Sequence, residues 1–161
     1  MKKLVVYYSL EGNTKLIAET VAGALGADIL ELRPKKEISA RGFMKYFWGG
    51  KQVFMKEKPE LHSFSKNPAE YDVIIIGTPV WSFTFSAPIN AFFSQIKLSG
   101  KKIALFCTHS GGMKKTLEDM EKKMEGNEVV DKADFIDVLI ARDENVQKAL
   151  DWAKKLNKSF E

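Results

Sequence analysis

The chain has 161 residues, of which 45% are hydrophobic and 29% charged, with 5 prolines and 11 glycines. This length suits one domain, and the composition excludes a disordered tail or a fibrous repeat. Lys and Arg number 25 and Asp and Glu 21, which gives a net charge of +4. Eight basic and three acidic residues lie between Arg33 and Glu60, so an anion-attracting surface is expected there.

Cys107 is the only cysteine, so the chain forms no internal disulfide and a reducing compartment fits best. No apolar run has the length that crosses a bilayer, and the N-terminal residues lead directly into a short strand without a signal-type segment. We therefore expect a cytoplasmic protein without membrane insertion.

Short apolar runs predict strands that are buried on both faces, as parallel strands covered by helices are. Four such runs occupy residues 4–8, 29–32, 73–76 and 103–107. A fifth strand is expected within residues 129–139. Asp131, Lys132 and Asp134 blur its beginning, so we predict it from Ala133 onward.

Helical periodicity separates these strands. Residues 14–25 carry one apolar stripe and precede Gly26, which stands where a helix-ending glycine belongs. A second helix is expected after Pro88, a third over residues 115–124, and a fourth over residues 144–156 with Asp143 as its N-cap. The alternation predicts a doubly wound α/β sheet in a single domain spanning residues 1–161.

Residues 34–71 are too long for a simple link between a strand and the next one. This insertion is basic and aromatic, with a cluster formed by Phe43, Tyr46, Phe47 and Trp48 beside Gly49, Gly50 and Lys51. We expect a short helix at about residues 40–47 and an irregular stretch after it.

In an open parallel sheet, ligands bind at the carboxyl ends of the strands where the strand order reverses. The first strand is followed by Ser9, Leu10, Glu11, Gly12, Asn13 and Thr14. Small hydroxyl residues, one glycine and the amides of a helix N-terminus form a cradle suited to a phosphate. The alternative is that Ser9, Asn13 and Thr14 only cap the helix.

Two further loops are expected at the same edge. The third strand is followed by Thr78, Pro79, Val80, Trp81, Ser82 and Phe83, and the fourth by Thr108, His109, Ser110, Gly111 and Gly112. An exposed aromatic pair suits a planar ring, and paired glycines let amides approach the edge of a ligand. The alternatives are hydrophobic packing of Trp81 and a plain glycine turn.

Together these loops resemble those of the flavodoxin family, in its short-chain members and reductase-like relatives. Residues 9–14 are similar to its FMN phosphate loop, residues 78–81 to its aromatic loop beside the isoalloxazine, and residues 108–112 to its second flavin-edge loop. The resemblance implies a five-stranded parallel sheet of order 2-1-3-4-5 with helices on both faces, noncovalent FMN and electron transfer. Glu11 stands where the family usually has Thr or Ser.

The resemblance favours an electron carrier without an acid, base or nucleophile of its own, acting with a redox partner protein or a small-molecule acceptor. The alternative is an FMN-dependent NAD(P)H reductase acting on a quinone or similar acceptor. In that case Arg41, Lys45 and Lys51 would receive a nicotinamide phosphate. Phe47 and Trp48 would line a substrate slot or a homodimer contact. A solvated charged face with a small aromatic cluster explains the same residues.

Other classes fit the sequence poorly. A phospho-receiver needs acidic residues where Tyr8, Ser9 and Gly77 stand. The basic stretch lacks the patterning of a nucleic-acid site. His62 and His109 do not form a convincing metal site with one distant cysteine, so neither nucleic acid nor a metal is expected.

Overall fold

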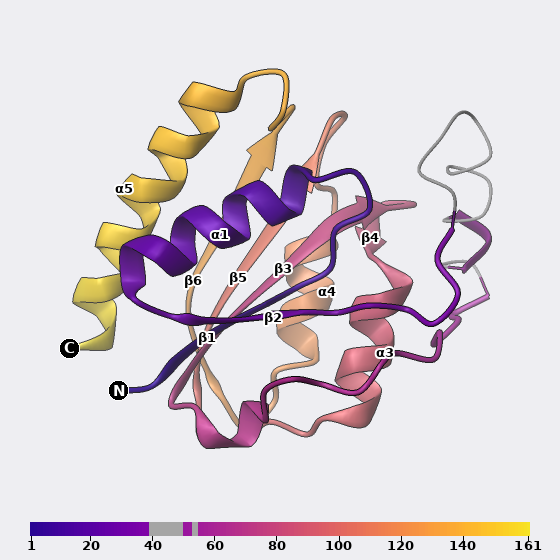
Figure 1. The fold of residues 1–161 in the computed structure, drawn as a ribbon, viewed down its shortest axis with the longest axis horizontal. Coiled ribbons are helices and arrows are strands. Elements are labelled where there is room, and N and C mark those ends of the chain that lie inside the picture. Colours follow the sequence, from indigo (N-terminus) through magenta and orange to yellow (C-terminus); the bar gives the residue numbers. More distant parts are fainter. Residues whose placement is uncertain (39–49, 53–54) are drawn as a thin grey trace.

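The computed structural model of the protein describes residues 1–38, 50–52 and 55–161 (Figure 1). Its sheet has the order β2-β1-β3-β5-β6, with β4 paired to β3 off this path. The strands are β1 (Lys3–Tyr7), β2 (Asp28–Glu31), β3 (Val73–Trp81), β4 (Thr84–Phe85), β5 (Lys102–His109) and β6 (Glu128–Ile136). All pairs except β3 with β4 are parallel, so the predicted order of the five parallel strands is confirmed.

Helices cover both faces of the sheet (Figure 1). Helices α1 (Asn13–Leu25) and α5 (Arg142–Phe160) pack on one face, and α3 (Ala87–Gln95) and α4 (Thr116–Lys122) pack on the other. A short 3₁₀ helix, η1 (Pro68–Glu70), precedes β3. No helix in the described part of the chain is long and apolar enough to cross a membrane.

The two hydrophobic cores explain the continuous apolar runs. Successive residues of β3 point to opposite faces, so Ile74 packs with α3 and α4 while Ile75 packs with α1 and α5. Both side chains are fully buried, and burial of each stabilises the fold by about 1.5–3 kcal/mol. The sheet is thereby fixed between two helical layers.

Gly77 allows the two central strands to pack around a phenyl ring. A Cβ atom built on Gly77 would lie 2.0 Å from Cζ of Phe106 on the neighbouring strand β5. No side chain fits there without displacing the ring. The glycine therefore permits β3 and β5 to pair with Gly77 opposite Phe106.

The last strand and helix differ from the prediction. Strand β6 begins at Glu128 and ends at Ile136, because it is an edge strand whose polar side chains find partners. Asp131 accepts a hydrogen bond from the Trp152 indole N–H at 3.0 Å and pairs with the Lys155 ammonium at 2.8 Å. The expected Asp143 cap was wrong, because Ala141 is the N-cap of α5 and Asp143 lies within its first turn.

The ends of the insertion after β2 lie side by side. Pro34 forms an isolated antiparallel bridge with Leu61, the Lys35 amide donates to the Glu60 carbonyl at 2.8 Å, and the His62 amide donates to the Arg33 carbonyl at 2.8 Å. The helix predicted at about residues 40–47, with its aromatic cluster and Arg41 and Lys45, lies outside the described residues.

Candidate functional site

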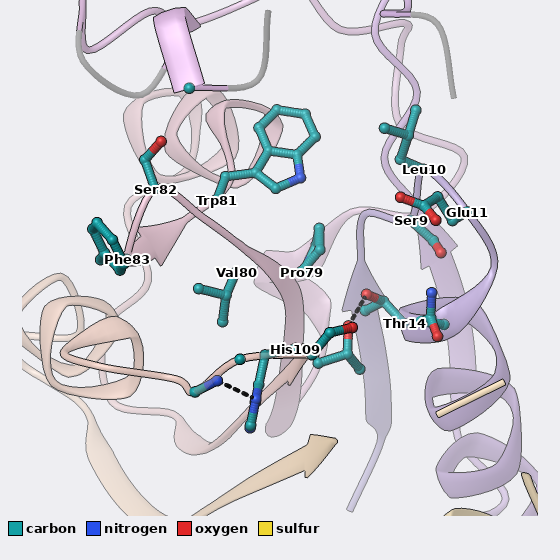
Figure 2. Close-up of a pocket in the computed structure, with 16 residues that line it drawn as sticks. Ser9, Leu10, Glu11, Thr14, Pro79, Val80, Trp81, Ser82, Phe83 and His109 are labelled. Carbon is teal, nitrogen blue, oxygen red and sulfur yellow. Dashed lines mark hydrogen bonds between the residues drawn. The ribbon is translucent and has the colours of Figure 1, made fainter. Parts of the chain in front are cut away.

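A pocket of about 470 Å³ opens at the carboxyl edge of the sheet, where β1, β3 and β5 end (Figure 2). Three segments that are distant in the sequence form its walls: residues 9–14, 79–83 and 108–112. Gly50 is an additional wall residue, and its sequence context gave no sign of this role. Every predicted site residue lines this pocket except Gly12 and Thr78.

The segment after β1 is organised by Ser9 and Gly12. The Ser9 hydroxyl oxygen accepts hydrogen bonds from the amides of Gly12 at 3.1 Å and Lys15 at 3.2 Å. Gly12 has a φ of 99°, a left-handed conformation that glycine adopts without steric cost. Gly12 therefore shapes the turn without lining the pocket.

Of Ser9, Asn13 and Thr14, only Ser9 accepts hydrogen bonds from amides at the beginning of α1. The Asn13 side-chain carbonyl accepts from the Leu139 amide at 3.2 Å, and Thr14 bonds to Thr108, so neither caps the helix. Among the described residues, the amides of Asn13 and Thr14 have no acceptor. Unpaired amides and the helix dipole make this end of α1 a favourable place for an anion.

A buried hydrogen bond joins the first and third segments. The hydroxyls of Thr14 on α1 and Thr108 on β5 lie 2.8 Å apart (Figure 2), and both residues are almost fully buried. Two hydroxyls can satisfy each other in this position where a single buried one would lose its bonds to water. The bond holds the two walls at a fixed separation.

The middle segment is a β-hairpin where the sequence predicted a loop. Strand β3 continues to Trp81 and pairs with β4 through Val80 with Phe85 and Trp81 with Thr84. The two turn residues, Ser82 and Phe83, have φ values of 45° and 70°. This is the pattern of a type I′ turn, which usually contains Asn and Gly. The absence of those residues hid the hairpin in the sequence.

Thr78 supports the hairpin from below the pocket. Its hydroxyl oxygen accepts from the Ser86 amide at 3.0 Å and lies 3.1 Å from the Ser86 hydroxyl. Thr78 is fully buried. Thr78, which the sequence placed among the cofactor-binding residues, does not line the pocket, because β3 continues past Thr78 and its side chain turns toward the beginning of α3.

Trp81 forms the aromatic wall of the pocket, opposite Leu10 (Figure 2). Its indole packs edge to face against Tyr8, with ring centroids 5.4 Å apart and an interplanar angle of 87°. The Tyr8 hydroxyl donates to Glu37 Oε1 at 2.6 Å. Burial, together with this carboxylate, raises the pKa of Tyr8, so the phenol stays protonated under Trp81. Packing on Tyr8 thus fixes the indole beside the pocket.

His109 fixes the third wall. Its Nδ1 accepts from the Gly112 amide at 3.0 Å (Figure 2), and its Nε2 lies 2.8 Å from Asp134 Oδ2. Because Nδ1 is an acceptor, the ring proton resides on Nε2 and is donated to Asp134. Gly112 has a φ of 117°, so the turn needs a glycine. His109 shapes the wall through both nitrogens.

The charge of the pocket differs from the basic surface that the composition suggested. Its lining, among the described residues, contains no lysine or arginine, whereas Glu11 contributes a carboxylate. The first turn of α1 has no acidic residue. An anion bound here would therefore be held by hydroxyls, amides and the helix dipole.

A family model described as Flavodoxin matches residues 2–156. The chain belongs to the flavodoxin family. A flavoprotein from Lactobacillus acidophilus, crystallised in complex with FMN, superimposes with a TM-score of 0.71 at 26% sequence identity, covering 88% of this chain and 97% of that chain. The NMR structure of its apo-form gives a TM-score of 0.65 at 26% identity, covering 86% of this chain and 94% of that chain.

The fold also matches oxidised flavodoxin 1 from Bacillus cereus, with a TM-score of 0.59 and 20% identity over 98% of both chains. This likeness concerns the fold, which the predicted strand order had indicated. The resemblance that the three loops suggested is confirmed by the family match.

Proposed function

We propose that this chain binds FMN noncovalently in the pocket at the carboxyl edge of the sheet and acts in electron transfer. The observation that carries the proposal is the convergence of an anion-binding helix end and an aromatic wall on one pocket. The Lactobacillus acidophilus relative that binds FMN has the same fold. The donors and the ring of this pocket suit the two chemically different ends of FMN.

The phosphate of FMN would lie against the N-terminus of α1. The Ser9 oxygen already accepts two amides, so its own proton is available to an anion. Of the Thr14 and Thr108 hydroxyls, one donates to the other, which leaves one proton for a ligand. Each hydrogen bond to a charged phosphate contributes about 1.5–3 kcal/mol, so three or four of them hold a phosphate without a lysine.

The flavin ring would lie beside Trp81, with the amides of the segment 108–112 at its edge. Contact with the indole contributes about 0.5–1.5 kcal/mol beyond the area that it buries. FMN supplies redox chemistry that side chains lack. The chain would hold the ring, exclude water from one side and leave the other accessible to a redox partner.

Three described side chains in or next to the pocket that could act as acid, base or nucleophile are already engaged or shielded. Tyr8 remains protonated, and His109 is engaged at both ring nitrogens. Cys107 is fully buried, and burial raises its thiol pKa to about 12. These properties support an electron carrier over an enzyme that makes or breaks bonds with its own groups.

The visible spectrum of the purified protein tests the proposal. We expect a yellow solution that releases FMN when the protein is denatured. A colourless preparation that shows no absorption by protein-bound flavin after incubation with excess FMN would contradict FMN binding, provided that circular dichroism shows a folded chain.

A second candidate is an FMN-dependent NAD(P)H reductase that passes electrons to a quinone. Arg41 and Lys45, which are expected to receive the nicotinamide phosphate in such a reductase, lie outside the described residues. The observation that favours this candidate is a second, lysine-lined pocket on the other side of the β3–β4 hairpin. Steady NADPH oxidation by the FMN-loaded protein with a quinone present supports the reductase, and its absence with either nicotinamide supports the carrier.

A further inference from the structure

A second pocket, of about 710 Å³, lies between β4, α3, α4 and the segment 56–58. One hairpin separates it from the flavodoxin-type pocket: Trp81, Ser82 and Phe83 line the first, whereas Thr84 and Phe85 line the second. Figure 1 shows β4 above α3 and α4, on the face of the sheet opposite α5. The volume is within the range of small-molecule sites.

Hydrogen bonds between distant elements give this pocket defined walls. The Thr84 hydroxyl on β4 donates to Asp119 Oδ2 on α4 at 2.8 Å. The Asn90 side-chain amide on α3 donates to the Glu57 carbonyl at 3.3 Å. Both bonds join residues more than thirty positions apart in the sequence. The walls of the cavity are therefore held in place by contacts between elements that are distant in the sequence.

Two phenyl rings provide an apolar wall. Phe85 and Phe93 pack edge to face, with centroids 5.4 Å apart and an interplanar angle of 82°. Both rings line the pocket and are only partly buried. Each keeps exposed ring surface, against which a planar ligand could stack.

The remaining rim is basic. Four lysines line the pocket against two acidic residues: Lys56, Lys58, Lys122 and Lys123 against Glu57 and Asp119. The Asp119 carboxylate already accepts a hydrogen bond from the Thr84 hydroxyl and pairs with the Lys122 ammonium at 3.5 Å. Among the described residues, Lys56, Lys58 and Lys123 pair with no carboxylate. Their ammonium groups are available to an anion.

We propose that this second pocket binds a nucleoside phosphate. Several ammonium groups around one cavity suit a group with about two negative charges, which a phosphate carries near neutral pH. The phenyl wall suits the planar base, and Thr84, Ser94 and Gln52 offer polar groups to a sugar. The site is independent of FMN binding, and it gives the reductase candidate a place for the adenosine end of its reductant.

The test is calorimetric titration of the FMN-loaded protein with adenosine 2′,5′-bisphosphate, adenosine and inorganic phosphate. We expect the bisphosphate to bind and each half alone to bind at least about tenfold more weakly. In the double variant Lys58→Glu/Lys123→Glu, bisphosphate affinity should fall at least about tenfold. The matched control Lys154→Glu/Lys158→Glu reverses two exposed charges on α5 and should change the affinity less than about twofold.

The outcomes separate the alternatives. Absence of bisphosphate binding by folded, FMN-loaded protein overturns the inference, as does equal weakening in both double variants. Inorganic phosphate binding as tightly as the bisphosphate excludes a nucleoside. A short polyglutamate peptide that binds these lysines more tightly than the bisphosphate would assign the surface to an acidic protein.

Two measurements keep this inference separate from the proposed function. The Trp81→Ala variant should retain bisphosphate affinity, and its loss there would place the probe in the first pocket and overturn the inference. Protein that binds the bisphosphate but never takes up FMN would contradict the proposed function alone.

Discussion

The two pockets on either side of the β3–β4 hairpin differ in how they can hold an anion. The first offers hydroxyls and helix amides fixed by buried strands, and it includes the carboxylate of Glu11. The second offers lysine side chains on exposed segments. Fixed neutral donors select for shape and direction, whereas flexible ammonium groups attract any anion of suitable charge. The positive net charge of the chain therefore agrees with the lysines of the second pocket. It gives no indication of the first pocket, whose lining among the described residues contains no lysine or arginine.

The largest expected effect concerns the phosphate in the first pocket. Riboflavin should bind at least about a hundredfold more weakly than FMN, because it forfeits two or more bonds of about 1.5–3 kcal/mol each. Quenching of flavin fluorescence during titration of the apoprotein measures both affinities. Equal affinities would exclude the N-terminus of α1 as the binding site of the FMN phosphate.

Replacement of the aromatic wall should have the next largest effect. Trp81→Ala should weaken FMN binding about tenfold, since both the stacking contact and the buried area are lost. It should also shift the visible flavin bands. Trp81→Phe retains a ring and should recover part of the affinity. An unchanged spectrum and affinity in the alanine variant would exclude Trp81 as the flavin partner.

Salt distinguishes the two modes of anion binding. Between low salt and about 0.5 M NaCl, bisphosphate affinity in the second pocket should fall about tenfold, because exposed ammonium groups are screened. FMN affinity should change less than about threefold over the same range, because its donors are neutral. FMN binding that is more salt-sensitive than bisphosphate binding would contradict neutral donors in the first pocket.

The shared hairpin should gain stability when its strain is relieved. Phe83 is 69% exposed and has a φ of 70°, so Phe83→Gly should raise the free energy of unfolding by about 0.5–1 kcal/mol. Phe83→Ala removes the same ring but retains the strain, and should bring no gain. Urea denaturation of both variants measures the difference, and a less stable glycine variant would refute the strained turn.

Glu11 should have the smallest effect. Glu11→Gln removes one negative charge from the lining of the first pocket and should tighten FMN binding about threefold through weaker repulsion. Glu125→Gln, at an exposed position after α4, is the matched control. Weaker FMN binding in the Glu11 variant would show that its carboxylate supports the pocket.

The strands could be predicted because residues such as Ile74 and Ile75 are buried on opposite faces, which produces a continuous apolar run. Their order was expected only from the resemblance to the flavodoxin family. Strand β6 was harder, because an edge strand shows its polar side chains to solvent. The three segments of the first pocket were predictable because parallel strands end at one edge. Their contacts depend on tertiary structure, as the Thr14 and Thr108 pair shows.

The hairpin, the position of Gly50 and the second pocket have no signature in the local sequence. The hairpin is formed by Ser82 and Phe83, which do not mark a turn in a sequence. Gly50 reaches the first pocket from the insertion after β2. The second pocket combines Lys58 with Lys122 and Lys123, residues whose proximity no spacing in the chain reveals.

The bridge between Pro34 and Leu61 determines how the chain tolerates changes of length. Because the backbone leaves and returns at adjoining points, the number of residues between them can vary at small entropic cost. An insertion or deletion there would leave the register of the sheet unchanged. Glu37, which accepts from Tyr8, and Gly50, which lines the first pocket, nevertheless tie the segment to the site.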